Sequence, residues 1–206
     1  GNMTFTYDIM KGLSFKSLWG LDYRLLQGER FTDPRTPDGA GVRGRNQQQS
    51  NTNVNFITTQ TLNYVKTFNN VHNISALVGF EYRSETNEDL FASSTGFSTF
   101  QFRTIGSGAV DESITGGWTG YHRTGVFFQA NYDYNKKYAA TITVRQDGSS
   151  RFGVENRFGL FKSISAAWIM KEENFLSGVD FVTDLKLRAS YGETGNDQIG
   201  NFDAVA

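Results

Sequence analysis

Apolar and polar residues alternate along several segments of the chain, and this period of two is typical of β-strands whose two faces meet different surroundings. In VHNISALVGFEYR, every second residue from Ile74 to Tyr82 is apolar, whereas Asn73, Ser75 and Glu81 take the opposite face. The same pattern, weakest in the third segment, predicts eight strands, at about residues 3–10, 13–24, 53–67, 71–83, 121–134, 137–146, 163–170 and 185–192.

The links between these segments alternate in length. MKG, FNN and NKK are tight, the links at about residues 25–52 and 84–120 are long, and DGSSRFGVENRFG is also longer than a tight turn. The last link has room for a short helix at about residues 171–176. Nothing requires such alternation in a soluble β-sandwich, whereas a meander that crosses a bilayer has short turns on one side and long loops on the other. The pattern therefore favours an all-β, antiparallel up-and-down meander of about eight strands.

Aromatic residues make up 15% of the 206 residues, with 18 Phe and 9 Tyr, although hydrophobic residues total only 38%. Several of them gather at strand ends beside the tight turns. Tyr and Trp at such positions suit a membrane interface, where the ring lies in the apolar layer and the polar atom meets water. The alternative is that these aromatic residues fill the core of a soluble β-sandwich. The residues concerned are Tyr132, Tyr134, Tyr138, Trp168 and Phe175.

Charge and cysteine content narrow the function classes. A formal net charge of −1 provides no positive field to attract nucleic acid, and the absence of cysteine rules out disulfides and thiolate chemistry. No run of apolar residues is long enough to predict a transmembrane helix. No signal peptide is recognisable, and the start GNMTF suggests a tag remnant, Gly1, on a piece excised from a longer protein.

Catalytic and metal chemistry is not predicted. A hydrolase would need a nucleophile with a base or two convergent carboxylates, and the sequence has no G-x-S-x-G motif and only two histidines. His72 and His122 both fall on apolar faces and suit interfacial or loop-end positions better than a metal site. We therefore predict no enzyme activity, no metal and no cofactor.

A longer motif occupies the last third of the chain. TVRQDGSSRFG is followed by a strand ending in tryptophan, an E-x-F segment and DLKLRASYGETGN. This order resembles the barrel of the SusC/RagA family of TonB-dependent outer-membrane transporters of Bacteroidetes. The earlier strands fit that family in pattern only, and Lys162 stands on an apolar face where the family often has proline. The signature positions are Arg145, Asp147, Gly148, Ser149, Ser150, Arg151, Phe152, Gly153, Trp168, Leu185, Leu187, Arg188, Ser190, Tyr191, Gly192, Gly195 and Asn196.

The resemblance implies a location and a function. It makes residues 1–206 part of a TonB-dependent receptor β-barrel of about 22 strands, without the plug and the C-terminal strands. It implies import of large nutrients, chiefly oligosaccharides and sometimes peptides, across the outer membrane, with a SusD-like surface lipoprotein as lid and TonB as the energy source. Outer-membrane lipid would contact the apolar face, and an isolated piece would self-associate through its open edges. The alternative is a soluble β-sandwich that binds carbohydrate.

The signature residues predict local structure rather than substrate contacts. In DGSS, the Asp and Ser side chains can cap backbone N–H groups, and glycine can take a positive φ. Arg145 and Arg151 could pair with Asp147 or Glu155, or stay solvated. The residues Arg123, Gln129, Asn131, Asp133, Lys186 and Arg188 project to the polar face, where contacts to a plug are expected. The second long link contains five aromatic residues, which are Phe91, Phe97, Phe100, Phe102 and Trp118. Two interpretations remain open for them: they stack on sugar rings, or they form a small core of the link itself.

Overall fold

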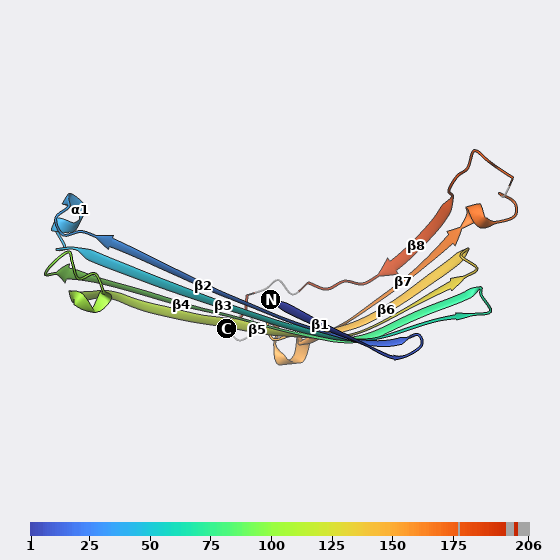
Figure 1. Ribbon diagram of the computed structural model, residues 1–206, viewed down its shortest axis with the longest axis horizontal. Coiled ribbons are helices and arrows are strands. Elements are labelled where there is room, and N and C mark those ends of the chain that lie inside the picture. Colours follow the sequence, from blue (N-terminus) through green and yellow to red (C-terminus); the bar gives the residue numbers. More distant parts are fainter. Residues whose placement is uncertain (177, 197–199, 202–206) are drawn as a thin grey trace. The chain divides into compact units, whose positions relative to one another are not determined.

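The computed structural model describes residues 1–176, 178–196, 200 and 201. It contains one eight-stranded sheet in which the strands follow one another in chain order (Figure 1). The strands are β1 (Asn2–Met10), β2 (Leu13–Thr32), β3 (Arg45–Phe68), β4 (His72–Phe97), β5 (Gly108–Tyr134), β6 (Tyr138–Ser149), β7 (Phe158–Ile169) and β8 (Lys186–Gly192).

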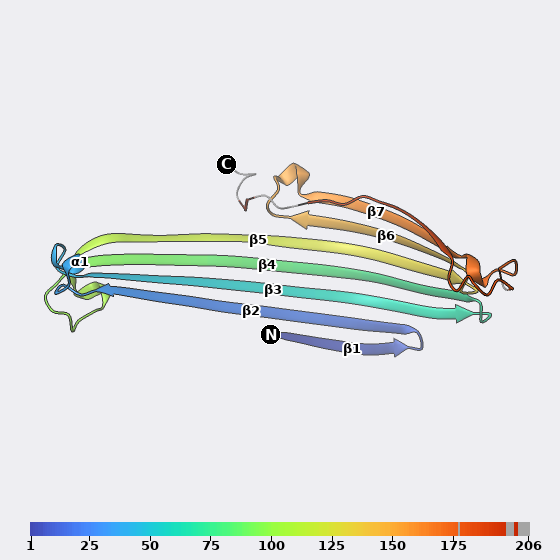
Figure 2. The same cartoon turned by 90° about the horizontal axis from the view of Figure 1, so that it is seen from above.

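The predicted fold class is confirmed. The strands form a single antiparallel meander (Figure 2), whereas the alternative β-sandwich would require two sheets packed face to face. The predicted strand count is also confirmed. Within the described residues, no helix is both long and apolar enough to span a membrane.

The predicted limits of the two long links are wrong. β2 continues to Thr32 and β3 already begins at Arg45, so the link covers residues 33–44 rather than 25–52. Likewise, β4 continues to Phe97 and β5 begins at Gly108, so the second link covers residues 98–107. At the start of β3 the run from Gln47 to Asn53 is polar on both faces and therefore shows no alternation that would mark it as strand.

The short turns have a specific backbone geometry. Asn69 and Asn70 both have positive φ, and the N–H of Val71 donates to the carbonyl oxygen of Phe68 at 3.2 Å. Asn135 and Lys136 repeat this conformation between β5 and β6. Two consecutive left-handed residues match the right-handed twist of the flanking strands, which is why such turns close hairpins.

The remaining links contain short helical turns. α1 (Pro37–Ala40) is capped by the side chain of Thr36, and η1 (Ile105–Ser107) and η2 (Val154–Asn156) are single 3₁₀ turns. The short helix predicted at residues 171–176 is wrong in type and limits, because only the 3₁₀ turn η3 (Met170–Glu172) forms there.

The chain divides into two compact units. The first contains residues 1–20, 56–84 and 121–206, and the second contains residues 21–55 and 85–120. The first unit therefore includes all the short turns and the complete strands β1, β6, β7 and β8. The second unit includes the links at residues 33–44 and 98–107.

The strand register confirms the predicted faces in the first unit. Ala130 of β5 lies opposite Ile142 of β6, which in turn lies opposite Ile164 of β7, and Ile164 lies opposite Tyr191 of β8. Because directly opposed side chains project to the same face, one face of these strands is apolar. It is also exposed: Ile142 is 48% and Ile164 is 53% accessible. An exposed apolar face of this extent needs an apolar environment.

Candidate functional site

The predicted aromatic residues beside the short turns form a continuous row, which we call the lower row. Ring centroids are 6.3 Å apart between Tyr134 and Tyr138, 6.4 Å between Tyr138 and Trp168, and 6.4 Å between Trp168 and Phe175. The row continues to β4, where the ring of His72 stacks on Tyr132 and its Nδ1 lies 2.7 Å from the Tyr132 hydroxyl. The prediction that His72 takes an interfacial position agrees with this environment.

Glu173, in the link after η3, binds the polar atoms of the lower row. Its carboxylate accepts hydrogen bonds from the hydroxyl of Tyr138 at 2.6 Å, from Nε1 of Trp168 at 3.2 Å and from Nζ of Lys137 at 3.2 Å. These hydrogen bonds, that of Tyr138 first, lower the pKa of Glu173 below its usual value. The polar atoms of Tyr138 and Trp168 thus point to an ionised group, while their rings stay in the apolar row.

A second aromatic row, the upper row, crosses four strands of the same unit. Trp19 of β2 lies 6.0 Å from Phe56 of β3, Phe56 lies 6.2 Å from Tyr82 of β4, and Tyr82 stacks on His122 of β5 at 6.0 Å between ring centroids. Sequence reasoning placed Trp19, Tyr82 and His122 on apolar faces but did not recognise the row. The sequence does contain a signal for this row. Tyr82 follows His72 by ten residues on β4, and Tyr132 follows His122 by ten residues on β5, so each strand has one aromatic ring near each end of its apolar face.

The spacing of the two rows fits an outer-membrane bilayer. Ten strand residues span roughly 33 Å along the strand. A strand tilted by about 40° then covers about 25 Å along the membrane normal, which is the height of the apolar band of outer-membrane barrels. Between the rows, β5 presents Val126, Phe128 and Ala130, of which Val126 is 53% and Phe128 is 43% exposed. The rows therefore bound the lipid-facing band.

The opposite face of these strands is polar and hydrogen-bonded. Asn131 donates to the hydroxyl of Ser75 at 3.1 Å and accepts from Thr141 at 2.9 Å and from Gln129 at 3.2 Å. Asp133 accepts from the side-chain amide of Asn73 at 3.0 Å. The predicted polar-face positions of Gln129, Asn131 and Asp133 thus agree with the structure.

Arg145 on the polar face is paired with two carboxylates. Nε of Arg145 donates to the carboxylate of Asp147 at 2.7 Å, and its NH2 group lies 3.3 Å from the carboxylate of Glu81. The guanidinium also lies 5.3 Å from the centre of the Phe127 ring. Phe127 in turn packs on Gly79, where a Cβ would come within 2.3 Å of the ring. Of the predicted alternatives for Arg145, pairing with Asp147 is confirmed.

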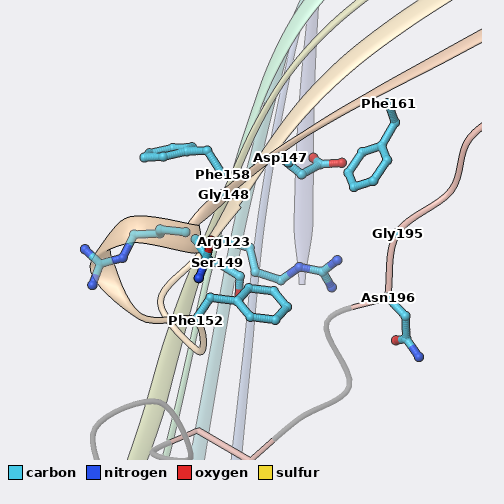
Figure 3. A pocket seen from close by; sticks show the side chains of 12 residues that line it. Arg123, Asp147, Gly148, Ser149, Phe152, Phe158, Phe161, Gly195 and Asn196 are labelled. Carbon is cyan, nitrogen blue, oxygen red and sulfur yellow. The ribbon is translucent and has the colours of Figure 1, made fainter.

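The signature segments meet around a cavity of about 210 Å³ in the first unit, which we call the signature pocket. Figure 3 shows Asp147 and Phe161 on one side, with Arg123 and Phe152 below them and Gly195 and Asn196 across the opening. Phe161 was not among the predicted residues. Its ring packs against Gly195, where a Cβ would lie 2.2 Å from the ring. The pocket is lined by Arg123, Asp147, Gly148, Ser149, Phe152, Asn156, Arg157, Phe158, Gly159, Phe161, Gly195 and Asn196.

Ser150 and Arg151 anchor the loop DGSSRFG to β5, and Ser149 forms a hydrogen bond within the loop. The hydroxyl of Ser150 accepts from the backbone N–H of His122 at 2.9 Å, and that of Ser149 accepts from the N–H of Arg151 at 3.4 Å. The guanidinium of Arg151 lies 3.8 Å from the centre of the buried Tyr121 ring. Its Nε also donates to the side chain of Asn201 at 2.7 Å. The predicted capping by serine side chains is confirmed.

The predicted positive φ at Gly148 is wrong. Gly148 belongs to β6 and is absent from the residues with positive φ within the described chain. Glycine is required there for space, because a Cβ would lie 2.6 Å from the ring of Phe158 and 3.0 Å from Oγ1 of Thr124. Asp147 was expected to cap a backbone N–H group. Its carboxylate instead forms an ion pair with Arg145.

The other signature residues lie away from the pocket. Trp168 belongs to the lower row, and the carbonyl oxygen of Leu185 accepts from the N–H of Lys171 at 3.2 Å. Gly153 directly precedes η2, and Gly192 lies opposite Ser163. On β8 the register puts Leu187 and Tyr191 on the apolar face and Arg188 and Ser190 on the polar face. Lys162, opposite Val144, lies on the apolar face as predicted.

The aromatic residues in the segment predicted as the second long link, at about residues 84–120, behave in two ways. Phe97 is 4% exposed and packs edge-on against Phe31 at 5.4 Å, and Phe100 lies 3.5 Å below the guanidinium of Arg35. Hydrogen bonds from Arg35 lower the pKa of Asp33 to about 2. Phe102 and Trp118 are 65% and 59% exposed. The small-core interpretation therefore holds for Phe97 and Phe100, whereas Phe102 and Trp118 remain accessible.

An apolar face bounded by two aromatic rows, backed by a hydrogen-bonded polar face, defines the wall of a β-barrel of the outer-membrane type. Residues 1–204 match the protein family described as TonB dependent receptor-like, beta-barrel. The chain therefore belongs to the TonB-dependent receptor β-barrel family, whose members are outer-membrane proteins and not enzymes.

Individual relatives agree with this family. The chain is 35% identical over its whole length to TonB-dependent receptor P3 of Formosa agariphila and covers 21% of that protein. Over 36% of its length it is 48% identical to TonB-dependent receptor SusC of Bacteroides thetaiotaomicron, covering 8% of that protein. It superposes on the solved RagAB peptide transporter with a TM-score of 0.90 and 27% identity, over 97% of this chain and 22% of that chain. The chain thus spans about a fifth of the length of P3, and its resemblance to SusC and RagA is confirmed.

Proposed function

We propose that the chain is a section of the barrel wall of an active importer that carries large, uncharged nutrients, chiefly oligosaccharides, across the outer membrane. A SusD-like surface lipoprotein acts as its lid, and TonB supplies energy. The plug and the closing strands belong to other parts of the same protein. The family membership and the similarity to SusC and RagAB support this proposal.

The polar face carries the proposal. Its hydrogen-bonding groups between the aromatic rows are mostly neutral, such as Gln129, Asn131 and Thr141, and Arg145 is neutralised by Asp147 and Glu81. Neutral donors and acceptors suit hydroxyl-rich chains, because they supply hydrogen bonds without requiring a charged partner on the solute.

Peptide import is the second candidate. The solved structure on which the chain superposes with a TM-score of 0.90 is that of a peptide transporter. Neutral amides such as those of Gln129 and Asn131 would also bind a peptide backbone.

Deletion of the parent gene distinguishes the two candidates. The deletion strain and a strain complemented with the intact gene are grown on neutral oligosaccharides as the carbon source or on peptides as the nitrogen source. The proposal predicts that growth fails on at least one oligosaccharide and recovers on complementation, and that deletion of TonB has the same effect. Failure on peptides alone supports the second candidate, and normal growth on every substrate contradicts import.

A further inference from the structure

A lysine lies within the lipid-facing band of the first unit. Lys162 of β7 is exposed and lies opposite Val144 of β6 on the apolar face. On the same face of β7, Phe158 and Trp168 are ten residues apart, which is the spacing of the two aromatic rows on β4 and β5. Lys162 lies six residues from Trp168, so it is roughly 15 Å above the lower row in a band of about 25 Å.

A charged side chain that faces lipid is unfavourable unless it has a partner or reaches water. On β4 between His72 and Tyr82, and on β5 between His122 and Tyr132, the alternate positions of the apolar face hold no charged residue. Lys162 therefore departs from the pattern of its neighbours. Its aliphatic stem can extend along the apolar surface toward the nearer boundary of the band, where the ammonium group can meet an anion.

An amide accompanies the ammonium group on this face. Gln146 of β6 is exposed, lies opposite Leu160 and is two residues beyond Val144, away from the lower row. Diagonal neighbours on antiparallel strands are about 7–8 Å apart, so long side chains at Lys162 and Gln146 can reach the same group. An ammonium and an amide donor together suit the oxygen atoms of a phosphate.

An apolar groove of about 390 Å³ lies between Lys162 and the lower row. Its floor consists mainly of three exposed alanines, which the register places side by side on β6, β7 and β8. Larger side chains border it on the side of the lower row. The residues that define its shape are Tyr132, Ala140, Ala166, Trp168, Leu187 and Ala189.

The separation of the lysine and the groove matches the two parts of a lipid. Ala166 lies four residues from Lys162, which is roughly 13 Å along β7. The hydrocarbon core of a bilayer is about 30 Å thick, so the acyl chains of one leaflet extend about 15 Å. Because the groove crosses β6, β7 and β8, a chain that descends at an angle to the tilted strands still reaches it.

The position of Lys162 indicates the leaflet. The lower row lies beside the short turns, and the short turns of outer-membrane barrels face the periplasm. Lys162 lies past the middle of the band on the other side, so its ammonium group is nearer to the headgroups of the outer leaflet.

We propose that Lys162 and Gln146 bind the phosphate of an outer-leaflet lipid, and that one acyl chain of this lipid fills the alanine-lined groove. The cation and the groove are independent features, and each matches one part of the same molecule. The proposal rests on lipid contact of this face and does not depend on the proposed import function.

Glu193 is the competing partner within the chain. Its backbone N–H donates to the carbonyl oxygen of Lys162 at 3.0 Å, so the two residues are neighbours across β7 and the segment after β8. A carboxylate here would attract the ammonium group and repel a phosphate. Replacement of Glu193 therefore distinguishes a lysine that binds lipid from one that only pairs within the protein.

The test uses native mass spectrometry of the full-length parent protein, delipidated and held in detergent micelles. The probes are diphosphorylated lipid A and the same lipid after removal of its phosphates. Lys162→Gln removes the ammonium group, whereas Lys162→Arg retains the charge. Ala166→Phe fills the groove. Ala76→Phe is the matched control, because Ala76 lies on the apolar face of β4 outside the lining.

We expect the wild-type protein to bind lipid A about tenfold more tightly than the dephosphorylated lipid. Lys162→Gln should lose this preference, since hydrogen bonds to a charged group are lost, and Lys162→Arg should retain it. Ala166→Phe should weaken binding of both lipids several-fold, whereas Ala76→Phe should bind both as the wild type does. Glu193→Gln should bind lipid A at least as tightly as the wild type.

Three results would overturn the proposal: equal affinity of the wild type for both lipids, a phosphate preference that survives in Lys162→Gln, or equal binding by Ala166→Phe and Ala76→Phe. Weaker binding of lipid A by Glu193→Gln would contradict it as well, because the carboxylate would then support the site. Unheated gels show beforehand that each variant migrates as a folded barrel.

Discussion

The hydroxyl of Tyr138, the first residue of β6, donates a 2.6 Å hydrogen bond to the carboxylate of Glu173 in the link that follows β7. Trp168, directly opposite Tyr138 on β7, donates to the same carboxylate oxygen at 3.2 Å. One acidic residue therefore connects two neighbouring strands of the lower row to the link after β7. This arrangement gives the E-x-F segment of the sequence a physical role, since Phe175 two residues later packs against Trp168.

Glu173→Ala should lower the thermal unfolding midpoint of the parent protein, because three donors lose their shared acceptor. Glu172→Ala is the matched control, since Glu172 is exposed and adjacent. The midpoint can be followed by the mobility shift of the heated barrel in gels. Equal midpoints for the two variants would show that Glu173 does not fix the link.

The stability supplied by Glu173 should depend on pH. Its pKa in the folded protein is lowered from the usual 4.5 by hydrogen bonds from Tyr138, Lys137 and Trp168. A lowered pKa means that the contribution is complete above pH 4.5 and is lost as the pH falls through the folded-state value. The midpoint difference between wild type and Glu173→Gln should therefore shrink on acidification below pH 4.5. A difference that is constant from neutral to acidic pH would contradict this linkage.

The faces of the strands could be predicted from sequence where the two faces meet different solvents. Ile142 and Thr141 illustrate the contrast, because one faces the apolar band and the other bonds to Asn131. The strand extensions could not be predicted, because the residues from Gln47 to Asn53 are polar on both faces and lack a period of two. A long polar strand then looks like a loop in sequence, although neighbouring strands satisfy its backbone.

Gly79→Ala should destabilise the barrel by about 1–3 kcal/mol, since overpacking forces neighbouring side chains off their positions. The added Cβ would lie 2.3 Å from Cζ of Phe127, and Phe127 supports the guanidinium of Arg145. Urea unfolding of the parent protein gives the free-energy change. Gly106→Ala is the control, because nothing lies within 4 Å of the added atom. Equal free energies in the two variants would show that Phe127 can move aside without cost.

Arg151→Lys should loosen the DGSSRFG loop although the charge is retained. The guanidinium of Arg151 lies 3.8 Å from the centre of the Tyr121 ring, and its Nε donates to Asn201. The ammonium group of lysine is not planar and cannot make both contacts at once. Stacking of this kind contributes about 0.5–2 kcal/mol, so backbone amides of the loop should exchange hydrogen several-fold faster. Glu155→Gln, at an exposed position of the same segment, should leave exchange unchanged. Unaltered exchange in Arg151→Lys would contradict the anchoring role.

The signature pocket could be predicted only in part. The motif identified Asp147, Ser149, Phe152 and Gly195, but not Phe161, which the register brings opposite Arg145. Phe161 lies on the polar face, where alternation predicts no aromatic residue. Its ring fills the space left by Gly195, and this relationship depends on the arrangement of β7 and the segment after β8.

The central claim is that the face between the two aromatic rows contacts lipid. The most direct test is nitroxide scanning of β5 from Gly125 to Asn131 in the parent protein in liposomes. The present chain contains no cysteine, so each labelled cysteine is unique within it. Accessibility to oxygen should alternate, with high values at Val126, Phe128 and Ala130 and low values at the residues between them.

The depth profile should be deepest near Val126 and Phe128, which lie midway between His122 and Tyr132. Alternation with this maximum would confirm that the two rows bound the lipid-facing band. Uniform accessibility, or oxygen contact at Phe127, Gln129 and Asn131 instead, would contradict it.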